Sequence, residues 1–312
     1  GAALLTVAMI LIAGGMSFLE NYQYSDPVVW LPVAIGFLVV GILATQQRRS
    51  KNPLTDWAAL RVAPIPATLV ILVILGMVLS GAMLQLMLLT QNVLGFTPLI
   101  AGVVSFGTSL MVVVFSPISP KVMAKIGLGL TTTIGLFLTA SGLFGLATIT
   151  ISTTPPEIMA WMALMGAGLG FGMPAVSAGA MSAVPRESLG AISGFIGMIA
   201  SLSAVLGIAV LGAISAIQVT HEWEATSSQV QNADSLTNQV ISGSIPQITK
   251  SEGEQTAVLA GQAYLDGVTF ALRIAGAGMV LAGAVSFPLL GSRGRVRKTD
   301  AAPTLVEPSE YT

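Results

Sequence analysis

Cysteine is absent from this sequence and histidine occurs once, which excludes disulfides, thiolate metal sites and multi-histidine metal centres. Charged residues are scarce: they make up 9% of the 312 residues, whereas an average soluble domain carries roughly 25%. Neither sign dominates, with 13 Lys and Arg against 14 Asp and Glu, so no bulk positive charge attracts a nucleic acid. Hydrophobic residues, in contrast, reach 54%. This composition excludes an ordinary cytosolic enzyme, a nucleic-acid binder and a disordered protein, and it predicts a membrane protein with a lipid bilayer around it.

Eight apolar stretches are long enough to cross a bilayer as helices, each of which needs about 20 residues. Their apolar runs are continuous, whereas the strands of a membrane barrel alternate apolar with polar residues. We therefore predict an all-α polytopic membrane protein with eight transmembrane helices. The expected spans are Ala2–Leu19, Val28–Ala44, Ala63–Leu89, Leu99–Ile118, Leu128–Ile151, Ile158–Val184, Ala191–Ile217 and Leu265–Leu290.

With eight spans, every second connecting segment lies on the same side of the membrane, and most basic residues lie in the segments of one side. An excess of Lys and Arg marks the cytoplasmic side, so we expect both ends of the chain in the cytoplasm of a plasma-membrane protein. The same topology predicts a cytoplasmic linker at 46–62, a long, mobile external loop at 218–264 and a disordered cytoplasmic tail at 291–312. The residues that set this orientation are Arg48, Arg49, Lys51, Arg61, Lys121, Lys125, Arg186, Arg293, Arg295, Arg297 and Lys298.

The sequence begins at Gly1, at the edge of an apolar stretch and without the charged-then-apolar pattern of a signal peptide. We therefore expect a portion of a longer protein, whose missing N-terminal half is a partner of the part seen here. A processed N-terminus is the alternative.

Small residues are concentrated in the sixth and seventh expected spans, where spacings of three or four residues let helix backbones approach closely. The sixth span also contains a proline, which removes one backbone donor and favours a kink. Two interpretations remain open: static packing, or an interface that bends and slides. The residues concerned are Gly166, Gly168, Gly170, Gly172 and Pro174 in the sixth span and Gly190, Gly194 and Gly197 in the seventh.

Four stretches resemble the C-terminal part of a major facilitator superfamily transporter, and more narrowly the fourteen-helix drug:proton antiporter branch. Thr90–Gly102 is similar to the external Q-x-V-L-G-x-S-P-L-x-A-G stretch of that branch, and Gly166–Pro174 to its glycine-rich helix. Ala183–Gly194 resembles its A-V-P-x-E-x-x-G-x-A-S-G loop and helix start, and Lys121–Gly127 resembles the degenerate cytoplasmic loop of the second half.

The resemblance implies a secondary transporter that exports amphipathic small molecules in exchange for protons by alternating access. Residues 1–45 would be two extra helices, and residues 63–290 a six-helix C-terminal bundle of two inverted three-helix repeats. In this family proton coupling is usually assigned to acids, often in the first half. No Asp or Glu lies in the middle of an expected span here, so we expect the coupling residues in the missing half.

Arg273 is the charged residue placed well within an expected span, where a charge costs at least about 2.5–3.5 kcal/mol at the bilayer centre. It follows Asp266 by about 10 Å along the helix, nearly on the same face. Two roles remain open. Arg273 reaches toward the outer surface and makes a structural pair there, or it faces the central cavity and takes part in translocation.

Six further residues are candidates for the transport pathway. Gln85 interrupts an apolar run, so it either bonds a neighbouring helix or lines the path of the substrate. Gln91 and Asn92 are expected at the outer mouth, where turn formation is the alternative role. Met83, Met173 and Phe106 suit a deformable apolar site, and filling space in the core is their alternative role.

Motifs of soluble enzymes are missing: there is no H-E-x-x-H, G-x-x-x-x-G-K-[ST] or G-x-S-x-G pattern. We expect no enzymatic activity, no cofactor and no metal. A non-transporting membrane scaffold or a membrane-embedded enzyme is the alternative to a transporter.

Overall fold

The structure is a computed structural model that describes residues 65–182, 189–227, 230 and 233–291, together with residues 11, 31, 34–36 and 38–39. Within these residues all regular structure is helical. The expected spans at 2–19 and 28–44, the linker at 46–62 and the tail after Gly291 lie outside the described residues, apart from the few positions just named.

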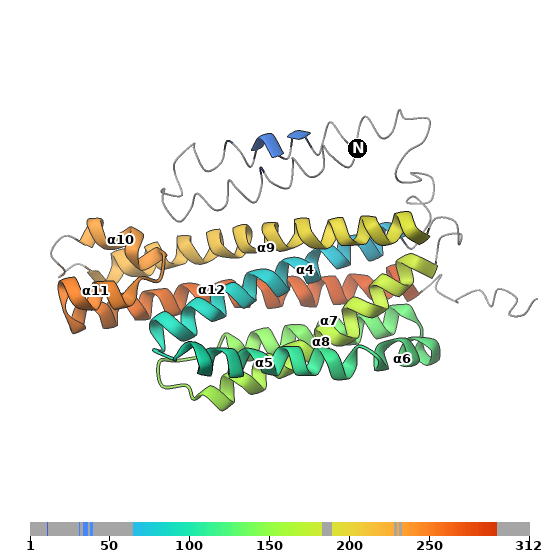
Figure 1. Ribbon diagram of the computed structural model, residues 1–312, viewed down its shortest axis with the longest axis horizontal. Helices are drawn as coiled ribbons and strands as arrows, with labels where there is room; N and C mark the ends of the chain where they lie inside the picture. Colours follow the sequence, from blue (N-terminus) through green and yellow to red (C-terminus); the bar gives the residue numbers. More distant parts are fainter. Residues whose placement is uncertain are drawn as a thin grey trace, which may run out of the picture.

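Six helices of the described part are long and apolar enough to cross a membrane, and they confirm an all-α, multi-pass membrane protein (Figure 1). Each coincides with one of the six expected spans after residue 62, although several ends differ. The helices are α4 (Ile65–Leu88), which continues into the π-helix η2 (Leu89–Val93), α5 (Pro98–Phe115), α7 (Leu128–Leu146), α8 (Pro155–Ser182), α9 (Leu189–Thr226) and α12 (Glu254–Gly291).

Local sequence explains where several of these helices begin and end. Thr97 accepts a hydrogen bond from the backbone N–H of Ile100 at 3.4 Å, and Pro98 follows at the first helical position of α5. The short helix α6 (Ile118–Ile126) ends at Gly127, whose φ of +87° suits glycine and separates it from α7.

The segment 218–264, expected as a long mobile loop, is mostly helical in the described residues. Helices α9 and α12 extend into it, and α10 (Ala233–Ile241) and α11 (Ile245–Glu252) lie between them (Figure 1). The reason is a small apolar core that the polar composition concealed. Trp223 is 1% exposed and its indole Nε1–H donates to the carbonyl of Ala233 at 3.1 Å, while Ile248 is fully buried.

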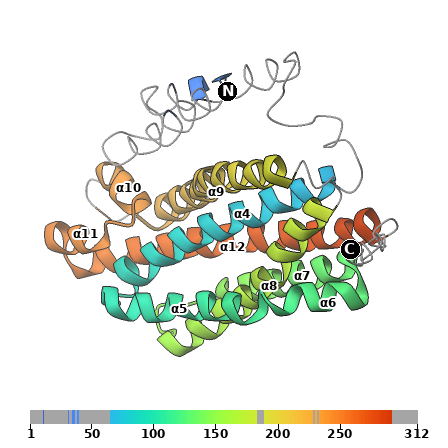
Figure 2. The same ribbon diagram turned by 45° about the vertical axis from the view of Figure 1, so that its right-hand side comes forward.

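The helices pack in a repeating pattern. Helix α4 packs along α9 and α5 packs along α8, so the first helix of each group of three contacts the second helix of the other (Figure 2). Helix α7 packs on both α8 and α12, and α12 also packs on α9. Large apolar side chains fill the interior between them, including Leu75, Leu86, Leu136, Leu143, Met165 and Leu169.

Candidate functional site

Two glycines of α8 bring that helix directly against the backbone of α5. A Cβ atom built on Gly166 would collide with the backbone of Thr108, and one on Gly170 would lie 3.1 Å from the Cα and the carbonyl oxygen of Val112. The Thr108 hydroxyl also donates to the carbonyl of Met162 at 3.0 Å. One face of α8 is therefore closely packed on α5.

The other two glycines of the same stretch lie against α7, and Gly172 also lies beside Leu75 of α4. A Cβ on Gly168 would collide with Thr139. A Cβ on Gly135 of α7 would lie 2.6 Å from the backbone nitrogen of Gly172. The two overlapping glycine pairs thus contact two different helices, and α8 is held between α5 and α7.

Pro174 lies inside α8, where it leaves the carbonyl four residues earlier without its helical donor. Close to that position, the Ser119 hydroxyl of α6 donates to the carbonyl of Phe171 at 2.7 Å. The rings of Phe171 and Phe115 are 5.2 Å apart. The bond from Ser119 supplies a donor beside the weakened turn, and no sequence motif had pointed to this serine.

Gln85 lies in the contact between α4 and α9. It is 8% exposed, and its side-chain amide donates to the carbonyl of Leu211 at 3.3 Å. A Cβ on nearby Gly81 would lie 2.5 Å from the carbonyl oxygen of Gly207. The structure therefore contains the hydrogen bond to a neighbouring helix that was one of the two expected roles. Met83, two positions earlier, packs half-buried against the apolar interior.

Gln91 and Asn92 lie in the π-helical turn η2 at the end of α4, both half-buried. The wider turn closes through hydrogen bonds from the N–H of Leu94 to the carbonyl of Leu89 at 3.0 Å and from Phe96 to Thr90 at 2.9 Å. Single π-helical turns occur frequently at functional sites. The sequence had indicated the polar pair but not this backbone geometry.

Phe106 lies on an exposed stripe of α5, where it is 58% exposed. Met173, in contrast, packs partly buried against the interior from α8. The stripe repeats at intervals of four and three residues, the spacing by which one helix contacts another along its length. We name this set the α5 stripe: Leu99, Val103, Phe106, Leu110 and Val113.

Helix α9 has a second exposed stripe, built from small residues. The expected close packing does not hold for Gly190, Gly194 and Gly197 in the described part of the chain, because a Cβ on any of them would meet nothing within 4 Å. The packed face of α9 is the opposite one, where Ser203 and Gly207 contact α4. We name the exposed set the α9 stripe: Gly190, Gly194, Gly197 and Ser201.

Arg273 lies at the level where α7 ends. Its guanidinium Nη2 donates to the carbonyl of Ala147, the C-terminal cap of α7, at 3.4 Å. Helix α7 is about 28 Å long from its 19 residues, close to the roughly 30 Å of a bilayer core, so its end lies near the edge of the hydrocarbon. A cation at a helix C-terminus interacts favourably with the helix dipole. Arg273 thus bonds the end of a neighbouring helix, and neither of the two roles expected for it is decided by this contact.

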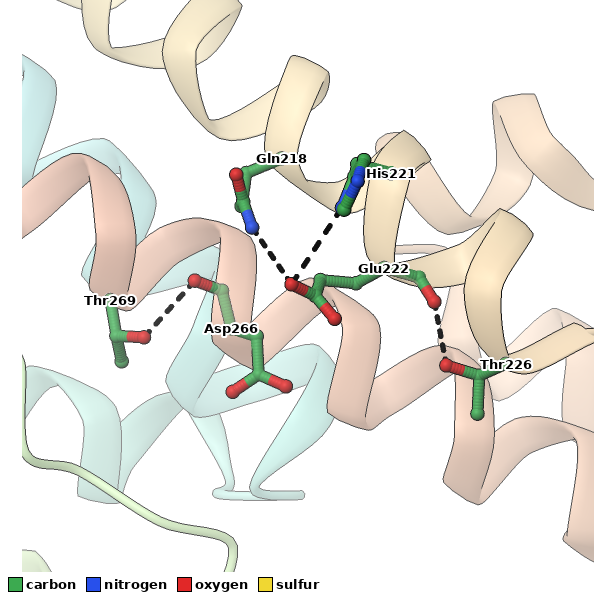
Figure 3. A network of polar contacts seen from close by, with 6 residues as sticks. All are labelled: Gln218, His221, Glu222, Thr226, Asp266 and Thr269. Atoms are coloured by element: carbon green, nitrogen blue, oxygen red, sulfur yellow. Dashed lines mark hydrogen bonds and ion pairs between the residues drawn. The ribbon is translucent and has the colours of Figure 1, made fainter.

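Polar residues of α9 and α12 gather near the same end of the bundle (Figure 3). The amide of Gln218 donates to Glu222 Oε1 at 2.8 Å, and His221 Nδ1 lies 4.0 Å from the same oxygen. Asp266 lies beside Glu222, across from it on α12 (Figure 3). Among the described residues, no group of three or more His, Cys, Asp or Glu side chains could hold a metal ion.

Comparisons with known proteins identify relatives that are longer than this chain. It is 26% identical to the tetracenomycin C resistance and export protein of Streptomyces glaucescens over 301 residues. This matched region covers 92% of the chain and 55% of that protein. It is 26% identical over 241 residues to the multidrug resistance protein Stp of Mycobacterium tuberculosis, covering 73% of the chain and 45% of Stp.

A third relative is the methyl viologen resistance protein SmvA of Salmonella typhimurium, 26% identical over 211 residues that cover 68% of the chain and 43% of SmvA. The chain spans about half the length of these curated relatives. The family model of the Major Facilitator Superfamily matches residues 2–208, which is more than half of the chain. Together with the six membrane-spanning helices of the described part, this match shows that the chain belongs to the major facilitator superfamily.

Proposed function

We propose that this chain is the C-terminal portion of a secondary active transporter, which exports amphipathic small molecules in exchange for protons by alternating access. Family membership supports a transporter rather than an enzyme. The names of three relatives, which refer to export or to resistance against drugs and methyl viologen, support the substrate class.

The observation on which this proposal rests is the pair of exposed stripes. Helices α5 and α9 present the α5 stripe and the α9 stripe outward at helix-pairing intervals, while the remaining spans bury far more of their residues. We assign these two surfaces to contact with the N-terminal half of the full protein. A pathway between the halves would then have Phe106 on its wall, with Gln85 and Met83 on the neighbouring α4.

The proposed orientation follows from the distribution of basic residues. Both ends of the chain lie in the cytoplasm, and α10, α11, Gln91 and Asn92 lie outside. The protein is placed in the plasma membrane on the same basis. Lys121 and Lys125, which belong to α6 and are exposed, would then face the cytoplasm, where Lys and Arg are enriched.

Proton coupling is assigned to the half that precedes this chain. Glu222 lies in the last turns of α9 (Leu189–Thr226) and Asp266 in the first half of α12 (Glu254–Gly291), the parts of these helices that lead to α10 and α11. Transporter sites in such folds lie near the midplane of the bilayer. These two acids are therefore poor candidates for the coupling site.

The test is efflux of a fluorescent cationic dye from cells that express the full-length protein, with and without a protonophore. We expect dye accumulation to fall on expression and to recover when the protonophore collapses the gradient. Accumulation equal to that of empty cells under both conditions would contradict export and favour a membrane scaffold. Efflux that persists after uncoupling would contradict proton coupling, while export itself would still be supported.

A further inference from the structure

A polar cavity of about 500 Å³ opens between α12 and the segment that connects α7 to α8. It lies at the end of α7, and none of its lining residues belongs to α5 or α9. Its polar lining comes from both sides, and the proposed transport pathway does not use it. The lining side chains that matter here are Thr148, Thr150 and Ser152 of the connection and Asp266, Thr269 and Arg273 of α12.

The cavity contains two opposite charges, Arg273 and Asp266, at different depths along α12. Arg273 and Asp266 are about 10 Å apart along α12, with Arg273 nearer the middle of the membrane-spanning part. They form no direct ion pair among the described residues, and the guanidinium of Arg273 donates to the Ala147 carbonyl. A guanidinium has five donors in a planar fork, so most of its capacity to bind an anion remains.

Apolar surface continues from the cavity toward the middle of the bundle. Phe144 of α7 is 41% exposed, and Ile274 and Leu281 of α12 are 44% and 67% exposed. Gly276 lies against the Phe144 ring, with a Cβ built on it 3.1 Å from Cε1, so α7 and α12 form one continuous surface there. The site therefore combines a cation, an anion and hydroxyls near the edge of the hydrocarbon with an apolar face below them.

This order of groups matches a phospholipid. The acyl chains lie deepest, the phosphate is next, and in an ethanolamine headgroup the ammonium lies one ethylene unit farther out. We propose that the cavity binds a phospholipid with an ethanolamine headgroup, its phosphate on Arg273, its ammonium on Asp266 and its acyl chains along Phe144, Ile274 and Leu281. The hydroxyls of Thr148 and Thr150 complete the polar surroundings.

The test measures lipids bound to the purified full-length protein by native mass spectrometry. The protein is titrated separately with dioleoyl phosphatidylethanolamine, phosphatidylcholine and phosphatidylglycerol. We expect roughly tenfold tighter binding of the ethanolamine lipid than of the other two, because its ammonium both carries a positive charge and donates N–H hydrogen bonds to a carboxylate. A choline headgroup has the charge without an N–H donor, and a glycerol headgroup has hydroxyl donors without the charge. Equal binding of the three lipids would overturn the proposal.

Three variants test whether Arg273 binds the lipid phosphate and Asp266 binds the ammonium. Arg273→Gln should weaken binding of all three lipids roughly tenfold, whereas Arg273→Lys should retain it. Asp266→Asn should remove the advantage of phosphatidylethanolamine over phosphatidylglycerol. Lys250→Gln on exposed α11 is the control and should change nothing.

Two results would overturn the assignment. The first is an Asp266→Asn variant that keeps its preference for phosphatidylethanolamine, which can be judged even where Arg273→Gln fails to fold. The second is displacement of the lipid by millimolar inorganic phosphate, because the cavity would then be a site for free anions rather than for a lipid.

Discussion

Helices α8 and α9 contain the same small-residue spacing, and the structure uses it in opposite ways. In α8 the glycines from Gly166 to Gly172 lie against α5 and α7, with no room for a Cβ atom at Gly166 and Gly168 and a tight fit at Gly170. In α9 a Cβ atom on Gly190, Gly194 or Gly197 would meet no atom of the described residues within 4 Å. A spacing of three or four residues thus identifies a face that permits close approach, but not whether a neighbour occupies it.

The difference between the glycines of α8 and α9 depends on how each helix is rotated about its own axis. A lipid-surrounded helix gains from close packing but has no hydrophobic force that requires any particular face to be covered. Helix α9 directs Ser203 and Gly207 toward α4, and this leaves Gly194 and Gly197 on the opposite side. On the proposed function that side meets the N-terminal half, so the two stripes should respond differently to bulky substitutions.

The largest effect is expected for Gly168→Leu. The new side chain would collide with Thr139 on α7, where backbone rather than a flexible side chain is the obstacle. Overpacking of this kind costs about 1–3 kcal/mol or more, so the full-length protein should lose folded yield and thermal stability. Fluorescence-detected size-exclusion chromatography after heating measures this. Wild-type stability in the variant would contradict the close contact between α7 and α8.

Gly194→Leu should leave folded yield close to wild type, because the position is open in the described structure. Efflux should nevertheless fall at least severalfold if the N-terminal half closes on the α9 stripe, since close helix contact there requires small residues. The measurement is dye efflux at matched expression, with Gly194→Ala as the milder variant. Unchanged efflux in Gly194→Leu would remove the α9 stripe from the proposed contact.

Ser119→Ala tests the support of the turn of α8 that contains Pro174. The substitution removes the Ser119 hydroxyl bond to the Phe171 carbonyl near Pro174, and the loss of one such hydrogen bond should cost about 1 kcal/mol. A decrease of the melting temperature by a few degrees is expected. Ser193→Ala is the matched control, because that exposed hydroxyl bonds only the carbonyl of Gly190 in its own helix. Equal effects of the two variants would contradict the role of Ser119.

The smallest effect on stability is expected for Gln85→Leu. Hydrogen bonds between membrane helices contribute on average about 0.6 kcal/mol, and leucine fills a similar volume in the contact between α4 and α9. Stability should therefore change little. Efflux of several chemically different substrates separates the two roles: an altered substrate profile at unchanged stability supports a pathway position, and an unaltered profile leaves only the packing role.

The sequence predicted the fold class and the existence of the six described spans, because hydropathy summed over about 20 residues is a local property. It was less accurate about span ends. Helix α9 continues to Thr226 and α12 begins at Glu254, well beyond the expected ends, since the polar segment between them folds on Trp223 and Ile248. A few buried residues in a polar stretch give too weak a pattern to reveal such a small core.

The sequence identified candidate residues that need a hydrogen-bond partner, but it did not identify the partners. The polarity of Gln85 and the cost of a charge at Arg273 identified both as residues in need of a partner. Their partners, the carbonyls of Leu211 and Ala147, each lie 126 positions away in the chain. No local pattern identifies a backbone acceptor at that separation, and the same limit explains why Ser119 was missed.

The sequence by itself determined that this chain is an all-α membrane protein, where its apolar helices lie and which family it resembles. Only the tertiary structure decided which glycines are packed, that Arg273 lies at the end of α7, and that the described residues of 218–264 are mostly helical. The reason is that insertion into a bilayer depends on composition along one helix, whereas the depth and rotation of a side chain depend on how each helix packs against the others.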